Sequence, residues 1–248
     1  YTRALEALGM SYDIWDADRV VDASLSQRLI PEVHVLQQYP VVLYQSGDAF
    51  AAVMQSTEDQ LRLQEYSNHG GKFIAFGQEL ASVFNSAATD NGSVFYSSYM
   101  GADWLSDSVN GETVFTETAQ LLIGAPGSPL AGYLFDVSAR GDGAGNQAFI
   151  DEIRRPSASG GIWTEFDDVR QLMMYGSGGV PVEAGIVALS NFARPSLESP
   201  ARSWSGRSIY FSFGLEGVND DTGFTPREEL MAKALVFALD DPMAVISS

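Results

Sequence analysis

The chain has 248 residues, 45% of them hydrophobic, which is enough to bury the core of one large α/β domain or two small ones. It carries 32 acidic and 14 basic residues, and the formal charge of −18 argues against nucleic-acid binding because such a surface repels phosphate backbones. The absence of cysteine excludes disulfides, thiolate metal sites and a cysteine nucleophile. Every apolar run is far shorter than the roughly 20 residues that a membrane helix needs, so we expect no membrane insertion.

The first third of the chain alternates between helix and strand patterns. Residues 1–9 have apolar side chains at helical spacing and end on a glycine suited to a C-cap, and Tyr12–Trp15 alternates like a short strand. Pro40–Gln45 is a continuous apolar run of the kind found in buried parallel strands. A capped helix follows through Tyr66, and Lys72–Phe76 is a second buried strand that runs into another helix.

The middle of the chain has a different rhythm. A hairpin signal at Asn110-Gly111 is followed by strand patterns without intervening helices, over residues 112–124, 131–138 and 171–175. The α/β rhythm then returns, with strands over 182–189 and 208–213 and a helix over 226–239. The whole pattern predicts an α/β fold: a mostly parallel sheet with helices on both faces and a β-rich insertion at roughly 105–180. We treat residues 1–248 as a single domain.

Three acidic residues follow predicted strands, namely Asp48, Glu79 and Glu216. Parallel strands present their sites at their carboxyl ends, so these acids could share one crevice. Paired carboxylates there could do acid–base work or hold a cation, which makes the three residues candidates for a catalytic role. The alternative is that they cap helix N-termini, and we favour it because two of the three positions open helices.

A glycine-rich loop offers oxygen ligands from Asp142, Asn146 and Asp151. Such ligands suit calcium, although their spacing does not match the EF-hand loop. The alternative is a loop braced by hydrogen bonds from side chains to the backbone. Calcium is the one cofactor that the sequence suggests.

The two histidines of the chain, His34 and His69, offer little for catalysis. His34 stands between valines and His69 in a polar turn, so a zinc site would need unusual help from carboxylates. A Ser–His–Asp triad would have to take one of them as its base. We interpret both as structural or surface residues.

Four stretches of sequence resemble the glutamine-amidotransferase-like domains of large secreted bacterial proteins: ALEALGMSYDIWD, YPVVLYQSGD, LQEYSNHGGKFIAFGQELA and YFSFGLEGV. The similarity is clearest in residues 4–86 and 207–240 and weak in the β-rich middle. It implies an amidotransferase-like, flavodoxin-like α/β fold, an extracellular or cell-surface location, and other domains of the same parent protein as partners. Such domains open with an apolar strand directly before the first helix, so we expect that strand to lie outside the sequence considered.

The chain departs from this family at the residues that carry its chemistry. Family members place a cysteine in a tight turn after the strand, where this chain has Gly77-Gln78-Glu79. Where the family has Phe-His-Pro-Glu, this chain reads Phe213-Gly214-Leu215-Glu216, so only the acid remains. Without thiolate and imidazole, glutaminase chemistry has neither nucleophile nor base. Gly77, Gln78 and Gly214 are therefore expected as binding positions only.

We expect a non-catalytic accessory or binding domain of a larger exported protein, its ligand unspecified. One alternative is a hydrolase that uses carboxylates, with or without a cation, and another is a carbohydrate-related module of the trehalose-utilisation type, whose members share a similar core. A binding module should show an exposed aromatic patch. The candidates for such a patch, although aromatics of this kind are more often core or loop-packing residues, are Tyr96, Tyr99, Trp104, Trp163 and Trp204.

Overall fold

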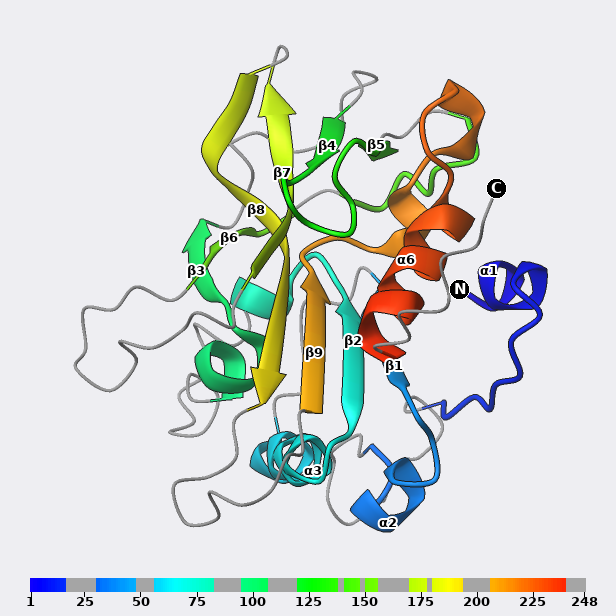
Figure 1. Cartoon of the computed structure of the whole chain (residues 1–248), viewed down its shortest axis with the longest axis vertical. Coiled ribbons are helices and arrows are strands. Elements are labelled where there is room, and N and C mark those ends of the chain that lie inside the picture. The colour runs from blue at the N-terminus through cyan, green and yellow to red at the C-terminus, as the bar shows by residue number, and fades with distance from the viewer. Residues whose placement is uncertain are drawn as a thin grey trace.

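Figure 1 shows the computed structural model of the chain, which describes residues 1–16, 30–47, 56–82, 95–106, 120–137, 141–147, 150–155, 170–177, 180–193 and 206–239. Its strands form one nine-stranded sheet with the order β1-β2-β9-β8-β7-β4-β5, and β3 and β6 branch from β8. The strands are β1 (Val42–Gln45), β2 (Lys72–Phe76), β3 (Asp103–Ser106), β4 (Gln120–Gly124), β5 (Leu134–Val137), β6 (Glu152–Arg154), β7 (Arg170–Ser177), β8 (Val180–Ala193) and β9 (Gly206–Phe211).

Three of the nine strands, β1, β2 and β9, are parallel to one another. β1 pairs with β2 in the register Val42↔Phe73, and β2 pairs with β9 in the register Phe73↔Ser208. The continuous apolar runs of the sequence therefore form neighbouring parallel strands, as predicted. Their carboxyl ends meet at one edge of the sheet, the edge at which doubly wound folds bind ligands.

The remaining strand pairs of the sheet are antiparallel. β8 runs against both β9 and β7, β7 runs against β4, and β4 runs against β5. β3 to β7 lie in or next to the predicted β-rich insertion, and the described part of residues 105–180 contains no α-helix. The fold is therefore α/β as predicted, with a parallel core that an antiparallel insertion extends.

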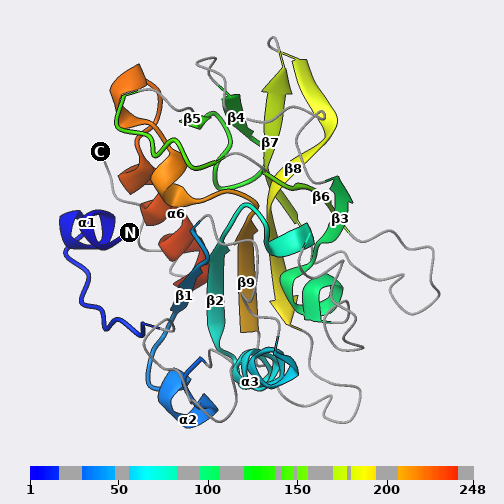
Figure 2. The same cartoon turned by 180° about the vertical axis from the view of Figure 1, so that it is seen from behind.

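Helices cover both faces of the parallel strands. α1 (Thr2–Ala7) and α6 (Arg227–Leu239) pack on one face, whereas α2 (Val33–Leu36) and α3 (Thr57–Asn68) belong to the other. Side chains of β2 alternate between the two cores, since Ile74 and Phe76 join the core beneath α6 while Phe73 and Ala75 join the core beneath α3. α6 lies in front of β1 and β2 in Figure 1 and behind them in Figure 2. Within the described ranges, every helix is too short or too polar to cross a membrane.

Local capping explains where the helices begin and end. The hydroxyl of Ser56 accepts a hydrogen bond from the backbone N–H of Asp59 at 3.0 Å, which caps α3. α6 is capped by a distant side chain, because Asp220 Oδ1 accepts from the N–H of Arg227 at 2.7 Å. Gly9 follows α1 with a φ of 67°, the left-handed conformation that ends a helix.

Two expectations for the amino-terminal third are wrong. Tyr12–Trp15 does not form a strand, and Ile14 and Trp15 are 71% and 51% exposed. The run ending at Gln45 forms a strand, but its residues are half-buried or exposed, whereas Phe73–Phe76 of β2 are buried. The reason is that β2 has a strand on each side, while in the described part of the chain β1 pairs only with β2.

Candidate functional site

The carboxyl edge of the parallel strands is covered by a polar loop from the insertion. Backbone hydrogen bonds between the parallel strands continue past the ends of β1 and β2. The N–H of Ser46 donates to Phe76 O, and the N–H of Gly77 donates to Phe211 O, both at 3.1 Å. Residues 141–147 bind to the segments that follow β2 and β9 at this edge. We call Gln78, Asn146, Gln147, Gly214 and Glu216 the carboxyl-edge cluster.

Hydrogen bonds join the five residues of the carboxyl-edge cluster. Gln78 Nε2 donates to the carbonyl oxygen of Asn146 at 2.8 Å, and the N–H of Gly214 donates to Gln147 Oε1 at 2.6 Å. Glu216 Oε1 accepts from Asn146 Nδ2 at 3.3 Å and from Gln147 Nε2 at 3.2 Å. Gln78 and Gln147 are only 3% and 4% exposed, so the loop covers this edge of the sheet.

Two glycines permit this close packing. A Cβ on Gly214 would lie 2.3 Å from Glu216 Oε1, and a Cβ on Gly77 would lie 2.0 Å from Ser46 Oγ. Neither glycine has a positive φ, so space rather than backbone conformation requires glycine here. The expectation that Gly77 and Gly214 are binding positions stays a prediction.

Glu216 keeps one oxygen uncommitted. Its Oε2 atom is buried without a hydrogen-bond partner among the described residues. Nearby, the hydroxyl of Tyr1 accepts from the N–H of Leu215 at 3.0 Å. Burial, followed by the Glu216 charge, raises the pKa of the Tyr1 hydroxyl well above its ordinary value, so this hydroxyl stays protonated near neutral pH.

The side chain of Asp151 caps the helix that begins at residue 80, shortly after β2. Its Oδ2 accepts from the N–H groups of Ala81 and Ser82, at 2.9 and 3.0 Å, and its Oδ1 accepts from Trp104 Nε1 at 3.1 Å. Asp151 is fully buried, and its own N–H donates to Gln78 O at 3.0 Å. A carboxylate from far along the chain therefore caps this helix, a role that no local pattern in the sequence indicated.

The proposed catalytic carboxylates have different surroundings. Glu79 is 8% exposed and its Oε2 accepts from the hydroxyl of Ser82 at 2.8 Å, whereas Glu216 accepts from the amides of the covering loop. Asp48 lies outside the described residues. Glu79 lies directly before the helical residues 80–82, and the N–H groups of Ala81 and Ser82 donate to Asp151, so helix capping by Glu79 stays a prediction.

The three candidate calcium ligands bind different partners. Asp142 forms an ion pair with Arg227 at 2.7 Å and accepts from the N–H of Asp220, while Asn146 belongs to the carboxyl-edge cluster and Asp151 caps a helix. Only the bonds of Asp142 to the N–H of Asp220 and of Asp151 to the N–H groups of Ala81 and Ser82 run from a side chain to the backbone, and calcium binding by this loop stays a prediction. Within the described ranges, no three His, Cys, Asp or Glu side chains are grouped so that they could hold a metal ion.

Both histidines lie at the amino edge of the parallel strands. His34 is in α2, which precedes β1, and His69 follows α3 directly before β2. Figure 1 shows α2 and α3 at the end where these strands begin, opposite the carboxyl-edge cluster. Neither imidazole can therefore act as a base at Gln78 or Glu216.

The predicted aromatic patch is not supported where the structure describes its members. Tyr96 is only 4% exposed and stacks edge-on with Tyr210, and Tyr99 and Trp104 are half-buried. Trp163 and Trp204 lie outside the described residues. Among the described residues, the exposed large apolar side chains, which sequence reasoning missed, are Met10, Ile14, Trp15, Leu61 and Leu134.

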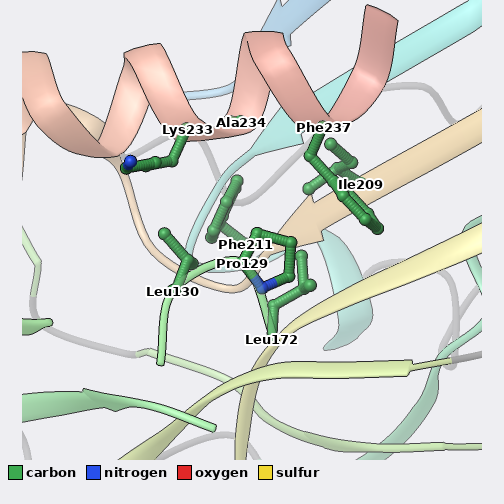
Figure 3. Close-up of a pocket in the computed structure, with 8 residues that line it drawn as sticks. All are labelled: Pro129, Leu130, Leu172, Ile209, Phe211, Lys233, Ala234 and Phe237. Atoms are coloured by element: carbon green, nitrogen blue, oxygen red, sulfur yellow. The ribbon is translucent and has the colours of Figure 1, made fainter. Parts of the chain in front are cut away.

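A small hollow lies between α6 and the sheet (Figure 3). Apolar side chains such as Leu172, Phe211 and Phe237 line it, together with Lys233. Its volume is about 180 Å³ including the solvent at its mouth, below the roughly 300–1,000 Å³ of small-molecule sites. We regard it as a packing defect of the core.

The side chains of the carboxyl-edge cluster are engaged with one another. Gln78 carries a carboxamide, which is no nucleophile, and the Glu216 carboxylate accepts from two amides. The cluster can hold the loop, orient a hydrogen-bonding ligand that displaces the loop, or accept one more donor at Glu216 Oε2.

Comparison with known proteins supports the fold. No protein-family profile and no curated protein matches the sequence. Among solved structures, the chain is similar to a cytoplasmic protein from Salmonella typhimurium, with 13% identity and a TM-score of 0.56 over 96% of this chain and 85% of that one. It is also similar to a protein from Bacteroides uniformis described as ThuA-like, with 13% identity and a TM-score of 0.52 over 96% of this chain and 82% of that one. Identities this low show a shared fold alone.

Proposed function

We propose that this chain is a non-catalytic accessory domain of the amidotransferase-like type that works by binding other domains of a larger exported protein. The proposal rests on the hydrogen bonds at the carboxyl edge. Gln78 stands in the turn after β2, and the loop residues Asn146 and Gln147 donate to Glu216. A site that is filled by its own chain and has no nucleophile suits a scaffold role. Exposed Ile14 and Trp15 supply apolar surface for a partner.

An ammonia-release assay on the purified chain with L-glutamine tests this proposal. We expect no release above background, and the same result for Gln78→Ala and Glu216→Gln. Release by the unmodified chain that either substitution abolishes would contradict the proposal, because the cluster would then be catalytic. Ammonia release that Glu216→Gln or Glu79→Gln removes, but that Gln78→Ala leaves unchanged, would favour the carboxylate hydrolase instead.

The carbohydrate-related module is a second candidate, because one structural neighbour is described as ThuA-like. A sugar would have to displace the loop 141–147 and take over the hydrogen bonds of Gln78 and Glu216. Isothermal titration with trehalose tests this reading. Binding that is lost in Glu216→Gln would support it over the accessory role.

A further inference from the structure

The side chain of Gln147 is bound at the carboxyl edge through both ends of its carboxamide. Its Oε1 accepts from the N–H of Gly214 at 2.6 Å, and its Nε2 donates to Glu216 Oε1 at 3.2 Å and to Asn146 Oδ1 at 2.9 Å. Gln147 is only 4% exposed. The carboxamide oxygen therefore meets a donor, and the carboxamide nitrogen meets two acceptors. We call the N–H of Gly214 and the carboxylate of Glu216 the carboxamide cradle.

The carboxamide cradle distinguishes a primary carboxamide from groups of similar shape. A carboxylate in the place of the Gln147 carboxamide would set a negative oxygen against Glu216, and like charges that close repel. An alkyl group would leave the N–H of Gly214 and the Glu216 carboxylate without these partners, which costs free energy at a buried place. The cradle therefore favours a group that accepts a hydrogen bond at one end and donates one at the other.

Two glycines leave the space that this contact needs. A Cβ on Gly217 would overlap Gln147 Cγ, and a Cβ on Gly214 would overlap the Glu216 carboxylate. Both glycines belong to the segment that follows β9, at the edge where doubly wound folds bind ligands. The space for a carboxamide side chain is therefore a property of this segment and not of the loop that fills it.

The loop that supplies Gln147 is held to the rest of the chain by polar contacts. The N–H of Ala144 donates to Glu216 O at 2.8 Å, and Asp142 forms an ion pair with Arg227 at 2.7 Å. None of residues 141–147, all of which the structure describes, belongs to either apolar core. Segments with few buried apolar contacts are among the parts of a fold that open at low cost. A ligand with the chemistry of the Gln147 side chain can therefore compete for the cradle.

We propose that the carboxamide cradle is a binding site for a primary carboxamide, which Gln147 fills from within the chain and which a glutamine side chain of a partner polypeptide fills once the loop is displaced. The exchange replaces each lost hydrogen bond of the cradle with one of the same kind. The partner as the source of the carboxamide rests on the proposed function. The site itself rests on the contacts of Gln147.

Rescue of an emptied cradle by a free amide tests the site. Gln147→Ala removes a methylene and the carboxamide, which acetamide supplies as a separate molecule. We expect about 0.2 M acetamide to raise the melting temperature of this variant by at least about 2 °C relative to the unmodified chain. Sodium acetate should raise it no more than sodium chloride of equal concentration, because Glu216 repels the carboxylate.

Gln38→Ala is the matched control for this rescue. It removes the same atoms from an exposed glutamine, whose Nε2 donates to His34 O, so acetamide should act on this variant as it does on the unmodified chain. The proposal is overturned if acetamide fails to stabilise Gln147→Ala, or if it stabilises all three chains equally.

A second variant tests the recognition if Gln147→Ala does not fold. Gln147→Glu keeps the shape of the side chain and sets a carboxylate against Glu216, so at pH 7 we expect it to melt about 5 °C or more below the unmodified chain. Toward about pH 4 the protonated acid can accept from Gly214 and donate to Glu216, so the difference should shrink. A difference that stays constant over this range would contradict recognition of the carboxamide.

A short peptide tests the partner as the source of the carboxamide. In acetyl-Gly-Gln-Gly-N-methylamide the glutamine side chain holds the one primary carboxamide. In isothermal titration we expect this peptide to bind Gln147→Ala at least about tenfold more tightly than the unmodified chain, in which the internal carboxamide competes, and the peptide with glutamate instead not to bind. Equal affinity for both chains, or rescue by acetamide without peptide binding, would refute a polypeptide ligand. Ammonia release from glutamine by the unmodified chain would refute the proposed function, and the acetamide result would still decide whether the cradle binds amides.

Discussion

At the scale of single residues, the carboxyl edge is defined by the hydrogen bonds that join Gln78, the loop 141–147 and Glu216. Gly214 leaves room for the Glu216 side chain to fold back over the backbone. Glu216 then serves as an acceptor for Asn146 and Gln147, which fixes the covering loop. Hydrogen bonds to a charged acceptor are worth about 1.5–3 kcal/mol each, so this carboxylate holds the loop in place.

Gly214→Ala tests this packing. The new methyl group would lie 2.3 Å from Glu216 Oε1, so the carboxylate must move and lose its amide donors. We expect a loss of about 1–3 kcal/mol in the free energy of unfolding, measured by urea denaturation. In a Glu216→Ala background the same change should cost much less, because the clash is gone. Equal costs in both backgrounds would show that Glu216 does not contact residue 214 in solution.

At the scale of elements, the sequence predicted the parts whose signals are local. Continuous apolar runs gave β1, β2 and β9, and the Ser56 cap gave the start of α3. It failed where a partner far along the chain decides the outcome. Asp151 caps residues 81 and 82 from far along the chain, and Tyr12–Trp15 does not form a strand despite its strand pattern. Local patterns carry no information about such contacts.

A pH-dependent prediction belongs to α3. Asp59 is 2% exposed, and burial raises its pKa above the ordinary 3.8, against the opposing effect of its bond from the N–H of Ile30. The folded state thus binds a proton more tightly than the unfolded state, so the contribution of this carboxyl to stability is full below pH 3.8 and declines as the pH rises through the raised value.

Asp59→Asn removes this titration and keeps an oxygen that can accept from Ile30. As the pH rises from about 3 to about 6, we therefore expect the free energy of unfolding of the variant to increase relative to that of the unmodified chain. Urea denaturation at several pH values in that range measures this difference. Glu58→Gln, on the exposed side of the same turn, is the control and should lack this trend. A difference that is constant with pH would mean that Asp59 titrates normally in the folded chain.

At the scale of the whole molecule, the fold is a parallel core extended by antiparallel strands, and its surface is strongly acidic. The α/β class, the position of the β-rich insertion and the helices on both faces followed from the sequence because they depend on the order of elements. The covering of the carboxyl edge by residues 141–147 did not follow from the sequence, because it depends on contacts with segments from two other parts of the chain. Order along the chain predicts layers, but it does not predict which loop covers an edge.

The acidic surface leads to a last prediction. With 32 acidic and 14 basic residues, repulsion between carboxylates destabilises the compact state at low ionic strength. Salt shortens the Debye length from about 30 Å at 0.01 M to about 8 Å at 0.15 M, so sodium chloride should raise the melting temperature over this range. Because Asp142 is already paired with Arg227, we expect calcium chloride at equal ionic strength to give the same rise. A larger rise with calcium that Asp142→Asn removes would instead identify a cation site in the loop, since only a ligand that binds the folded state adds stability beyond screening.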